Sequence, residues 1–208
     1  MGDTDPLWAV LTHADRKGNR WDPAEFFQTG VEFTEYTKGQ AGVFGLPFGG
    51  ADALDFGCGV GRLARALSPY FQHVVGVDIS QPMINRGKEL GPPANVELIL
   101  NLQDDLARFE DASFDYVQTF LVLQHMHPHY QARYLAEFSR LLRPGGVLIF
   151  QITTHDIEAE TIGQCDGFVA IDQVRDTKIG LRMFPMPPSQ VLLILDEVGI
   201  DFMALERP

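Results

Sequence analysis

The sequence predicts an α/β protein with a doubly wound, mostly parallel sheet that carries helices on both faces. From residue 51 onward, short apolar runs that suit buried strands alternate with segments of helical spacing. Single helices between strands imply parallel pairing through right-handed crossovers. A glycine-rich turn, DFGCGVG, joins the first apolar run to a helix, in the place where open α/β sheets bind their ligands.

The chain of 208 residues is long enough for one core with appendages but not for two full domains. We therefore expect a single domain over 1–208. Its expected parts are a helical leader or lid at 1–50, a cofactor-binding core at 51–153, an insertion at 154–189, and a last helix and strand at 190–208.

The leader contains a clear helix start, because Asp22 suits an N-cap and Pro23 the first helical position. In the core we expect strands at the apolar runs 53–56, 74–78, 96–100, 114–120 and 147–152. Helices are expected at 61–67, 83–90 and 130–142, the first with Arg62 and Arg65 pointing outward. The run RPGG at 143–146 predicts the end of the third helix.

After residue 154 the alternation of strand and helix stops. The segments 168–174 and 179–184 alternate between apolar and polar residues and predict an inserted β-hairpin. A last helix at 190–198 and a strand at 201–206 follow. The edge of the hairpin offers a surface through which two copies could pair as a homodimer.

Composition and charge exclude several function classes. With 16 Lys+Arg against 28 Asp+Glu, the formal net charge is -12, which repels nucleic acids and anionic membrane surfaces. Two cysteines form no disulfide framework and suit a reducing compartment. The acidic N-terminus is no signal peptide and no apolar run is long enough to span a membrane. We expect a cytoplasmic protein.

The glycine turn favours one kind of cofactor. Gly57 allows the sharp turn, Gly59 lets a ligand approach the backbone, and Gly61 permits close packing of the helix. Dinucleotide folds use G-x-G-x-x-G, whereas the spacing here is G-x-G-x-G. Asp55 would repel a pyrophosphate but suits an ammonium group or a structured water. Asp78, at the end of the second strand, is placed to accept ribose hydroxyls. A dinucleotide and other nucleoside cofactors all have such hydroxyls, so Asp78 alone does not distinguish between them.

Five motifs in the same order resemble the class I S-adenosylmethionine-dependent methyltransferases: LDFGCGVGR, VVGVDIS, FEDASFDYV, LVLQHM and LLRPGGVLIF. The resemblance covers roughly residues 51–153 and implies the Rossmann-like methyltransferase fold. It implies S-adenosylmethionine as cofactor and S-adenosylhomocysteine as product. The segment 21–30 also resembles the helical lids that cover the cofactor in many of these enzymes.

The resemblance implies a set of cofactor-binding residues. Around the methionine and ribose it places Asp55, Gly57, Cys58, Gly59 and Gly61, with Asp78 on the ribose hydroxyls. Near the adenine it places Ile79 and Met83, and at the adenine amino group Gln103 or Asp104, of which we favour Asp104. Beside the methionine moiety and the acceptor opening it places Phe120 and Gln124.

The sequence departs from the family in two respects. The family's sheet normally ends in a seventh, antiparallel strand, which we do not find before Pro208. Either that strand is absent, the chain is a shortened form, or the hairpin at 168–184 fills a related role. The second departure is Cys58 within the turn, where a small buried thiol is best explained by packing.

Methyl transfer needs a general base only if the acceptor arrives protonated, as a hydroxyl often does. His125 follows the fourth strand at the mouth of the expected site and is the candidate base, although it could equally cap or pack under the next helix. His127 and His129 lie close by, but Pro128 interrupts the run and no metal site is expected. His155 and Asp156 form a second candidate acid–base pair.

These observations predict an S-adenosylmethionine-dependent methyltransferase that acts on a small molecule, with oxygen as the favoured acceptor atom. One alternative is a non-catalytic S-adenosylmethionine-binding domain that serves as a partner or regulator. A less favoured alternative is an NAD(P)-dependent reductase, which Asp55 and the glycine spacing oppose.

Overall fold

The computed structural model describes residues 4–153, 175–176 and 182–203. They divide into two compact units. The sheet unit comprises 1–118 and 141–149, and the α5 unit comprises 119–140 and 150–208. The expected single domain and its four parts remain a prediction.

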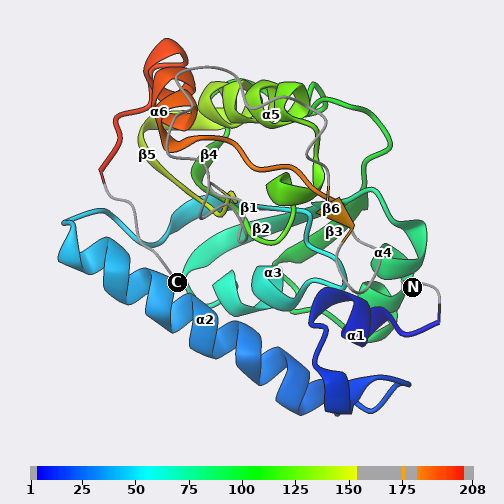
Figure 1. The fold of residues 1–208 in the computed structure, drawn as a ribbon. Helices are drawn as coiled ribbons and strands as arrows, with labels where there is room; N and C mark the ends of the chain where they lie inside the picture. Colours follow the sequence, from blue (N-terminus) through cyan, green and yellow to red (C-terminus); the bar gives the residue numbers. More distant parts are fainter. Residues whose placement is uncertain (1–3, 154–174, 177–181, 204–208) are drawn as a thin grey trace. The chain divides into compact units, whose positions relative to one another are not determined.

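A five-stranded sheet forms the centre of the sheet unit (Figure 1). Its strands are β1 (Gly50–Phe56), β2 (Phe71–Asp78), β3 (Val96–Leu100), β4 (Phe114–Thr119) and β5 (Leu142–Phe150). They lie in the order β3-β2-β1-β4-β5, and β1 pairs in parallel with both β2 and β4. The order reverses between β1 and β4, which confirms the predicted doubly wound sheet.

The strands form where the sequence places apolar runs, and their side chains build the main core. Ala53 and Leu54 of β1 and Val74 of β2 are fully buried. The cluster around them consists of Ala53, Cys58, Ala64, Leu67, Phe71, Val74, Ile84, Val96, Leu98, Tyr116 and Val147. Near-continuous burial along β1 and β2 is expected for central parallel strands.

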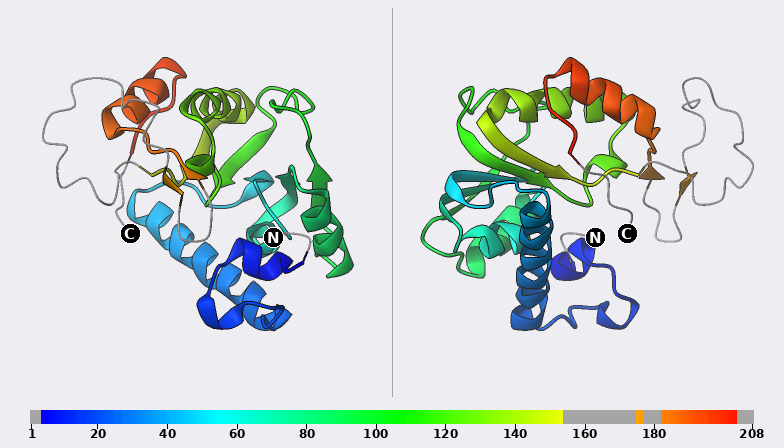
Figure 2. Two further views of the ribbon diagram at one scale, coloured as in Figure 1. Left: turned by 45° about the vertical axis from the view of Figure 1, so that its right-hand side comes forward. Right: turned by 90° about the vertical axis from the view of Figure 1, so that its left-hand side faces the viewer.

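Helices α3 (Arg62–Leu67) and α4 (Gln81–Glu89) lie against the same face of the sheet, because the Leu98 side chain touches the Cβ positions of both Gly61 and Gly87. The long helix α2 (Pro23–Val43) packs on α3 (Figures 1 and 2). The Asp22 carboxylate accepts hydrogen bonds from the first turn of α2, so the predicted N-cap is confirmed.

Arg62 does not point outward as predicted. Its side chain is buried and lies over the Phe33 ring of α2, with Thr29 at hydrogen-bond distance. A Cβ atom on Gly30 would lie 2.6 Å from the Arg62 carbonyl oxygen. The absence of a side chain at Gly30 therefore lets α2 approach α3 closely enough to cover Arg62.

The third helix ends at Leu141, just before the run 143–146 that was predicted to stop it, but the next strand differs from the prediction: β5 begins at Leu142 and includes this run. Pro144 can take part because β5 lies at the edge of the sheet, where a missing N–H is tolerated. Arg143 holds the segment beside the sheet through ion pairs with Asp52 and Asp115.

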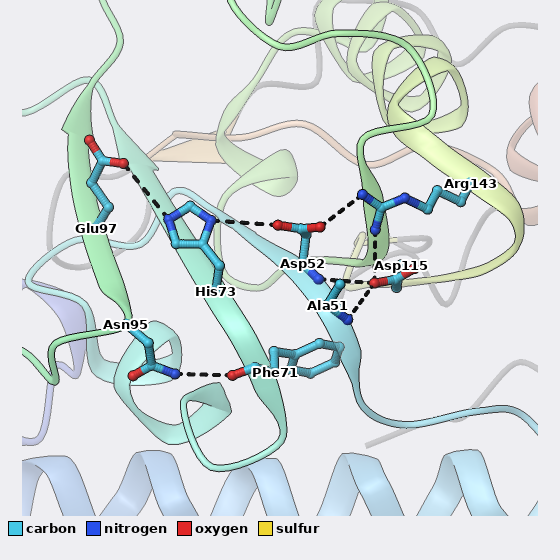
Figure 3. Close-up of polar contacts among 8 residues, drawn as sticks. All are labelled: Ala51, Asp52, Phe71, His73, Asn95, Glu97, Asp115 and Arg143. Atoms are coloured by element: carbon cyan, nitrogen blue, oxygen red, sulfur yellow. Dashed lines mark hydrogen bonds and ion pairs between the residues drawn. The ribbon is translucent and has the colours of Figure 1, made fainter.

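These ion pairs belong to a network at the amino end of the strands (Figure 3). Arg143 lies 2.8 Å from Asp52 Oδ2 and 2.9 Å from Asp115 Oδ2. Asp115 Oδ2 also accepts the Ala51 and Asp52 backbone N–H groups. His73 lies between Asp52 and Glu97. The network links β1, β2, β3, β4 and β5 at the end opposite the glycine turn.

The α5 unit contains η2 (Leu123–His125), α5 (Pro128–Leu141) and α6 (Pro188–Glu197). Two short strands, β6 (Arg175–Asp176) and β7 (Arg182–Met183), pair antiparallel. Most of the expected hairpin lies outside the described residues. Residues 201–203 of the expected last strand are in no strand, and 204–206 lie outside the described residues.

Gln131 is the main polar tie within the α5 unit. Its side chain is fully buried, and Nε2 donates to the carbonyl oxygens of Leu123, Met126 and Phe184. The residue therefore fixes η2 and the segment after β7 to α5. Across the described parts of the chain, no helix combines the length and the hydropathy that a membrane span requires.

Candidate cofactor site

The glycine turn sits at the carboxyl end of β1, beside the reversal in strand order. Gly57, Gly59 and Gly61 all adopt the left-handed backbone region, with φ of 75°, 55° and 83°. Three glycines are therefore needed for the path of the chain itself. This conformation returns the backbone sharply from β1 into α3.

Four backbone N–H groups of the turn donate hydrogen bonds within the protein. Gly57 and Cys58 both donate to the Val77 carbonyl, at 2.8 and 3.0 Å, and Gly61 donates to the Cys58 carbonyl at 2.8 Å. Gly59 donates to Asp78 Oδ2 at 2.7 Å. Phosphate-binding loops instead present such groups to the ligand. The turn is thus poorly suited to a pyrophosphate, in agreement with its spacing.

The space above Gly59 is filled by the leader. A Cβ atom on Gly59 would lie 2.9 Å from Val10 Cγ2. Val10 ends α1 (Pro6–Val10), whose apolar residues join a cluster with Phe26, Val60 and Met83. Gly59 therefore accommodates this helix in the structure, whereas the sequence predicted room for a ligand. The function of the leader as a lid remains a prediction.

Asp78 connects the turn to the next crossover. Its Oδ2 accepts the Gly59 N–H and its Oδ1 accepts the Ser80 N–H at 2.8 Å, just before α4. The side chain is half-buried. A carboxylate offers about four acceptor positions, so these two bonds leave capacity for ligand hydroxyls. The sequence predicted the location of Asp78 but not its bond to Gly59.

Asp55 lies beneath the turn and is only 2% exposed. Its Oδ1 accepts a hydrogen bond from Gln118 Nε2 at 3.1 Å, whereas its buried Oδ2 makes no hydrogen bond of ordinary geometry to the described residues. Burial raises the pKa of Asp55 to about 6, against the lowering effects of Gln118 and Arg62. The hydrogen bond from Gln118 and the charge of Arg62 therefore offset only part of the cost of burying the Asp55 carboxylate.

The expected adenine side is formed by the ends of β2 and β3. Ile79 and Leu102 are strongly exposed apolar residues, at 72% and 66%, and leave neighbouring strands at the same edge. Gln103 and Asp104 are also exposed. Met83 is buried in the cluster with Leu7, Phe26 and Val60, which places it in the core.

The sequence analysis assigned no role to Asn101 or Leu102 at this edge of the sheet. Asn101 is buried, and its Nδ2 donates to the carbonyl oxygens of Gln103 and Asp105, which shapes the turn after β3. An Asn directly after a strand is a recognisable turn signal. Exposure of an apolar residue such as Leu102 has no comparable signal in a single sequence.

Cys58 points into the core. Its side chain is 6% exposed, and its Sγ lies 2.9 Å from the position that a Cβ on Gly76 would take. Burial raises its pKa well above the ordinary value. The packing role expected for the thiol fits this position.

Phe120, Gln124 and His125 belong to the α5 unit. Phe120 is half-buried, Gln124 is buried, and His125 is exposed. The Gln124 amide lies 3.4 Å from His125 Nε2, and the Gln124 carbonyl accepts the Phe184 N–H at 2.7 Å. The structure therefore brings Gln124 and His125 together in η2 and ties Phe184 to them.

His127 and His129 adjoin this group, with their Nδ1 atoms 2.7 Å apart. Aromatic contacts join His127 to Phe184 and His129 to Tyr130. Within the described residues, no three His, Cys, Asp or Glu side chains form a group that could hold a metal ion. His155 and Asp156 lie outside the described residues.

The donor set of the sheet unit fits a cationic nucleoside. Asp55 and Asp78 supply two carboxylates, and Arg62 is the cation that lowers the pKa of Asp55. Sulfonium and ammonium groups are stabilised by negative charge in a region of low dielectric constant. Apolar Ile79 and Leu102 beside the carboxylates suit a flat base.

Comparison with known proteins gives consistent matches. A family model described as a methyltransferase domain matches residues 54–150. The 2-methyl-6-phytyl-1,4-hydroquinone methyltransferase of Synechocystis sp. is 32% identical over 150 residues, which cover 71% of this chain and 46% of that protein. The ubiquinone biosynthesis O-methyltransferase of Maricaulis maris is 29% identical over 141 residues, covering 62% of this chain and 54% of that protein.

The chain therefore spans about half the length of these curated relatives. Among solved structures, an S-adenosylmethionine dependent methyltransferase from Mesorhizobium loti superposes with a TM-score of 0.58. It is 22% identical, and the match covers 74% of this chain and 76% of that one. At this identity the likeness establishes the fold.

Proposed function

We infer the activity from the family: residues 54–150 belong to the class I methyltransferases that use S-adenosylmethionine, and we propose that this chain methylates a small molecule. The observation that carries the proposal is the buried carboxylate of Asp55 beneath a turn in which four backbone N–H groups, those of residues 57–59 and 61, are already bonded within the protein. Such a site favours a cation over a phosphate.

In this proposal, Asp55 supplies the negative charge that balances the ammonium group of the cofactor. Asp78 accepts the ribose hydroxyls while it holds Gly59 in place. The exposed apolar side chains of Ile79 and Leu102 would hold the adenine, with Gln103 or Asp104 at its amino group. Gly57, Gly59 and Gly61 shape the turn that these groups surround.

When bound, S-adenosylmethionine would supply a methyl group on a sulfonium, and the C–S bond would break towards sulfur as the acceptor oxygen formed the new C–O bond. The work left to the protein is to align the acceptor, to exclude water and to take the acceptor proton. His125 is the proposed base, with Phe120 and Gln124 beside the acceptor. Gln124 lies within reach of His125 Nε2 and orients the ring.

We propose a hydroxylated aromatic ring of the quinol type as the acceptor and oxygen as its reacting atom. By their names, two relatives act on a hydroquinone and in ubiquinone biosynthesis. The α5 unit also contains a series of ring contacts that joins Phe184, His127, His129 and Tyr130, beginning two residues after His125 in the chain. Flat rings of this kind pack well against a flat aromatic acceptor.

The first test is calorimetry of the purified chain with S-adenosylmethionine and S-adenosylhomocysteine, with NADH as the comparison ligand. We expect both sulfur nucleosides to bind and NADH not to bind. Binding of NADH alone would favour the reductase and overturn the proposal. A panel of quinols and phenols, analysed by mass spectrometry, then identifies the acceptor; cofactor binding without any transfer would favour the non-catalytic alternative.

Substitution of the proposed base separates binding from chemistry. For His125→Ala we expect turnover to fall by about a hundredfold or more, the usual contribution of a general base, with unchanged affinity for S-adenosylhomocysteine. His73→Ala, which removes a histidine at the amino end of the strands, is the control and should keep its turnover. Full activity of His125→Ala would assign this residue to a structural role.

A further inference from the structure

Asp55 and Gln118 form a buried cross-strand pair at the reversal of the sheet. They are direct partners in the register of β1 and β4, although 63 positions separate them in the sequence. Both side chains are almost fully buried, at 2% and 1% exposure. The Gln118 amide donates to Asp55 Oδ1 at 3.1 Å. The other oxygen, Oδ2, is buried and makes no hydrogen bond of ordinary geometry to the described residues.

The orientation of the Gln118 amide is set by Tyr116. The Tyr116 hydroxyl lies 3.1 Å from Gln118 Oε1 and donates to it, which leaves Nε2 as the end that faces Asp55. Tyr116 is itself 1% exposed, and burial raises the pKa of its hydroxyl, so it stays a protonated donor. Thr37 of α2 also bonds to Tyr116 and lowers that pKa. A chain of buried polar groups thus runs from α2 to Asp55.

This chain opposes the effect of burial on Asp55. Burial raises the pKa of Asp55, and among the groups that lower it the Gln118 hydrogen bond has the largest effect. Arg62 and the Ala64 N–H of α3 lower it further, whereas Asp78 raises it. If the Gln118 amide could turn over, its oxygen could accept a hydrogen bond from a protonated Asp55 carboxyl. The Tyr116 hydroxyl donates to that oxygen, so the NH₂ group faces Asp55 and favours the ionised carboxylate.

We propose that Gln118 is a positioning residue, held by Tyr116, which keeps Asp55 ionised so that its carboxylate balances the cationic end of the cofactor. The inference rests on the proposed function, since it assumes that Asp55 balances the ammonium group of S-adenosylmethionine. Gln118 touches neither cofactor nor acceptor; it acts through the carboxylate. Its effect should therefore be confined to ligands that carry the amino-acid tail.

The experiment compares two probe ligands in two variants. S-adenosylhomocysteine carries the ammonium group, whereas 5′-methylthioadenosine has the same nucleoside and lacks the amino-acid tail. Their affinities are measured by calorimetry between about pH 5 and about pH 8, where a carboxyl with a raised pKa titrates. Gln118→Met removes the amide donor at similar length, and Tyr116→Phe removes only the hydroxyl that orients the amide.

For Gln118→Met we expect about tenfold weaker binding of S-adenosylhomocysteine at about pH 7, the usual size of a lost hydrogen bond to a charged group. The affinity for 5′-methylthioadenosine should stay the same. The pH at which S-adenosylhomocysteine affinity is half lost should move upward, because Asp55 then holds its proton more tightly. Tyr116→Phe should show the same changes at smaller size.

Gln131→Met is the matched control, since it replaces another fully buried glutamine, in the α5 unit. It should lower thermal stability without moving the pH midpoint. Equal weakening of both ligands in Gln118→Met, or an unmoved midpoint, would overturn the inference. If Gln118→Met does not fold, the same criteria apply to Tyr116→Phe. If the unaltered chain binds neither ligand, the proposed function itself has failed.

Discussion

The two ends of the same sheet treat their carboxylates differently. At the amino end, Asp52 and Asp115 share the Arg143 guanidinium, and every group of that network is at least a fifth exposed to solvent. At the carboxyl end, Asp55 is 2% exposed and has an amide as its direct partner. At the amino end, opposite charges form ion pairs with one another. At the carboxyl end, the Asp55 carboxylate is buried without such an ion pair among the described residues.

The difference indicates at which end of the sheet a bound cation would stabilise the protein. Ion pairs that are open to water gain little from each other and attract little else. A buried carboxylate with an oxygen that makes no hydrogen bond lowers the stability of the folded protein, and binding of a cation offsets that cost. The amino end is therefore a structural clasp, and the carboxyl end is suited to recognition of a cation. Substitutions of Asp55, Asp78 and Asp115 test this contrast.

Asp55→Asn should stabilise the unliganded protein at neutral pH. The pKa of Asp55 in the fold, about 6, exceeds its ordinary value of 3.8, so the folded protein binds this proton more tightly than the unfolded chain. The free energy of unfolding therefore falls as the pH rises through this window, by up to roughly 3 kcal/mol. Thermal unfolding of both proteins at several pH values measures the difference, which should vanish in acid.

The same substitution should weaken S-adenosylhomocysteine binding, because the ammonium group loses its counter-charge. Greater stability combined with weaker binding is the expected pattern of a residue kept for function. An unliganded Asp55→Asn protein that melts below the unaltered chain at neutral pH would contradict the assignment of a costly buried charge.

Asp78→Ala should weaken S-adenosylhomocysteine binding by about 1–3 kcal/mol, the cost of leaving hydroxyl groups without a charged acceptor. It also removes the hydrogen bond that holds the Gly59 N–H. Calorimetry measures the change, and Asp78→Asn, which keeps an acceptor oxygen, should lose less. Unchanged affinity would show that the end of β2 does not contact the ligand.

Asp115→Ala should leave cofactor affinity unchanged and lower the free energy of unfolding by about 1 kcal/mol. Burial raises the pKa of Asp115, but the Asp52 N–H, Arg143 and the Ala51 N–H together bring it below the ordinary value. Its contribution is thus present above the unfolded pKa and is lost as the pH falls through the folded pKa, opposite in sign to that of Asp55. Denaturant unfolding at two pH values checks both points, and Arg143→Gln should reproduce the effect in weaker form.

Much of the sheet could be predicted from the sequence because its information is local. An apolar run such as the one that forms β2 indicates a buried strand by itself, and the glycine spacing identifies the turn. Asp55 and Asp78 follow from their places relative to that turn.

The parts that were wrong or missed depend on distant residues. Arg62 is buried because α2, about 30 residues earlier, lies on it through Gly30. β5 starts early because Arg143 reaches Asp52 and Asp115. The role of Gln118 depends on a register between β1 and β4 that the sequence does not specify. Local patterns contain none of these contacts.

The contact between Val10 and the glycine turn has an optical consequence. The chain has two tryptophans, and both flank this contact: Trp8 lies in α1, and the Trp21 indole donates to the Leu11 carbonyl. All indole emission of the protein therefore originates in the segment that packs on the turn. Displacement of that segment by a ligand would be recorded as a change in intrinsic fluorescence, without any label.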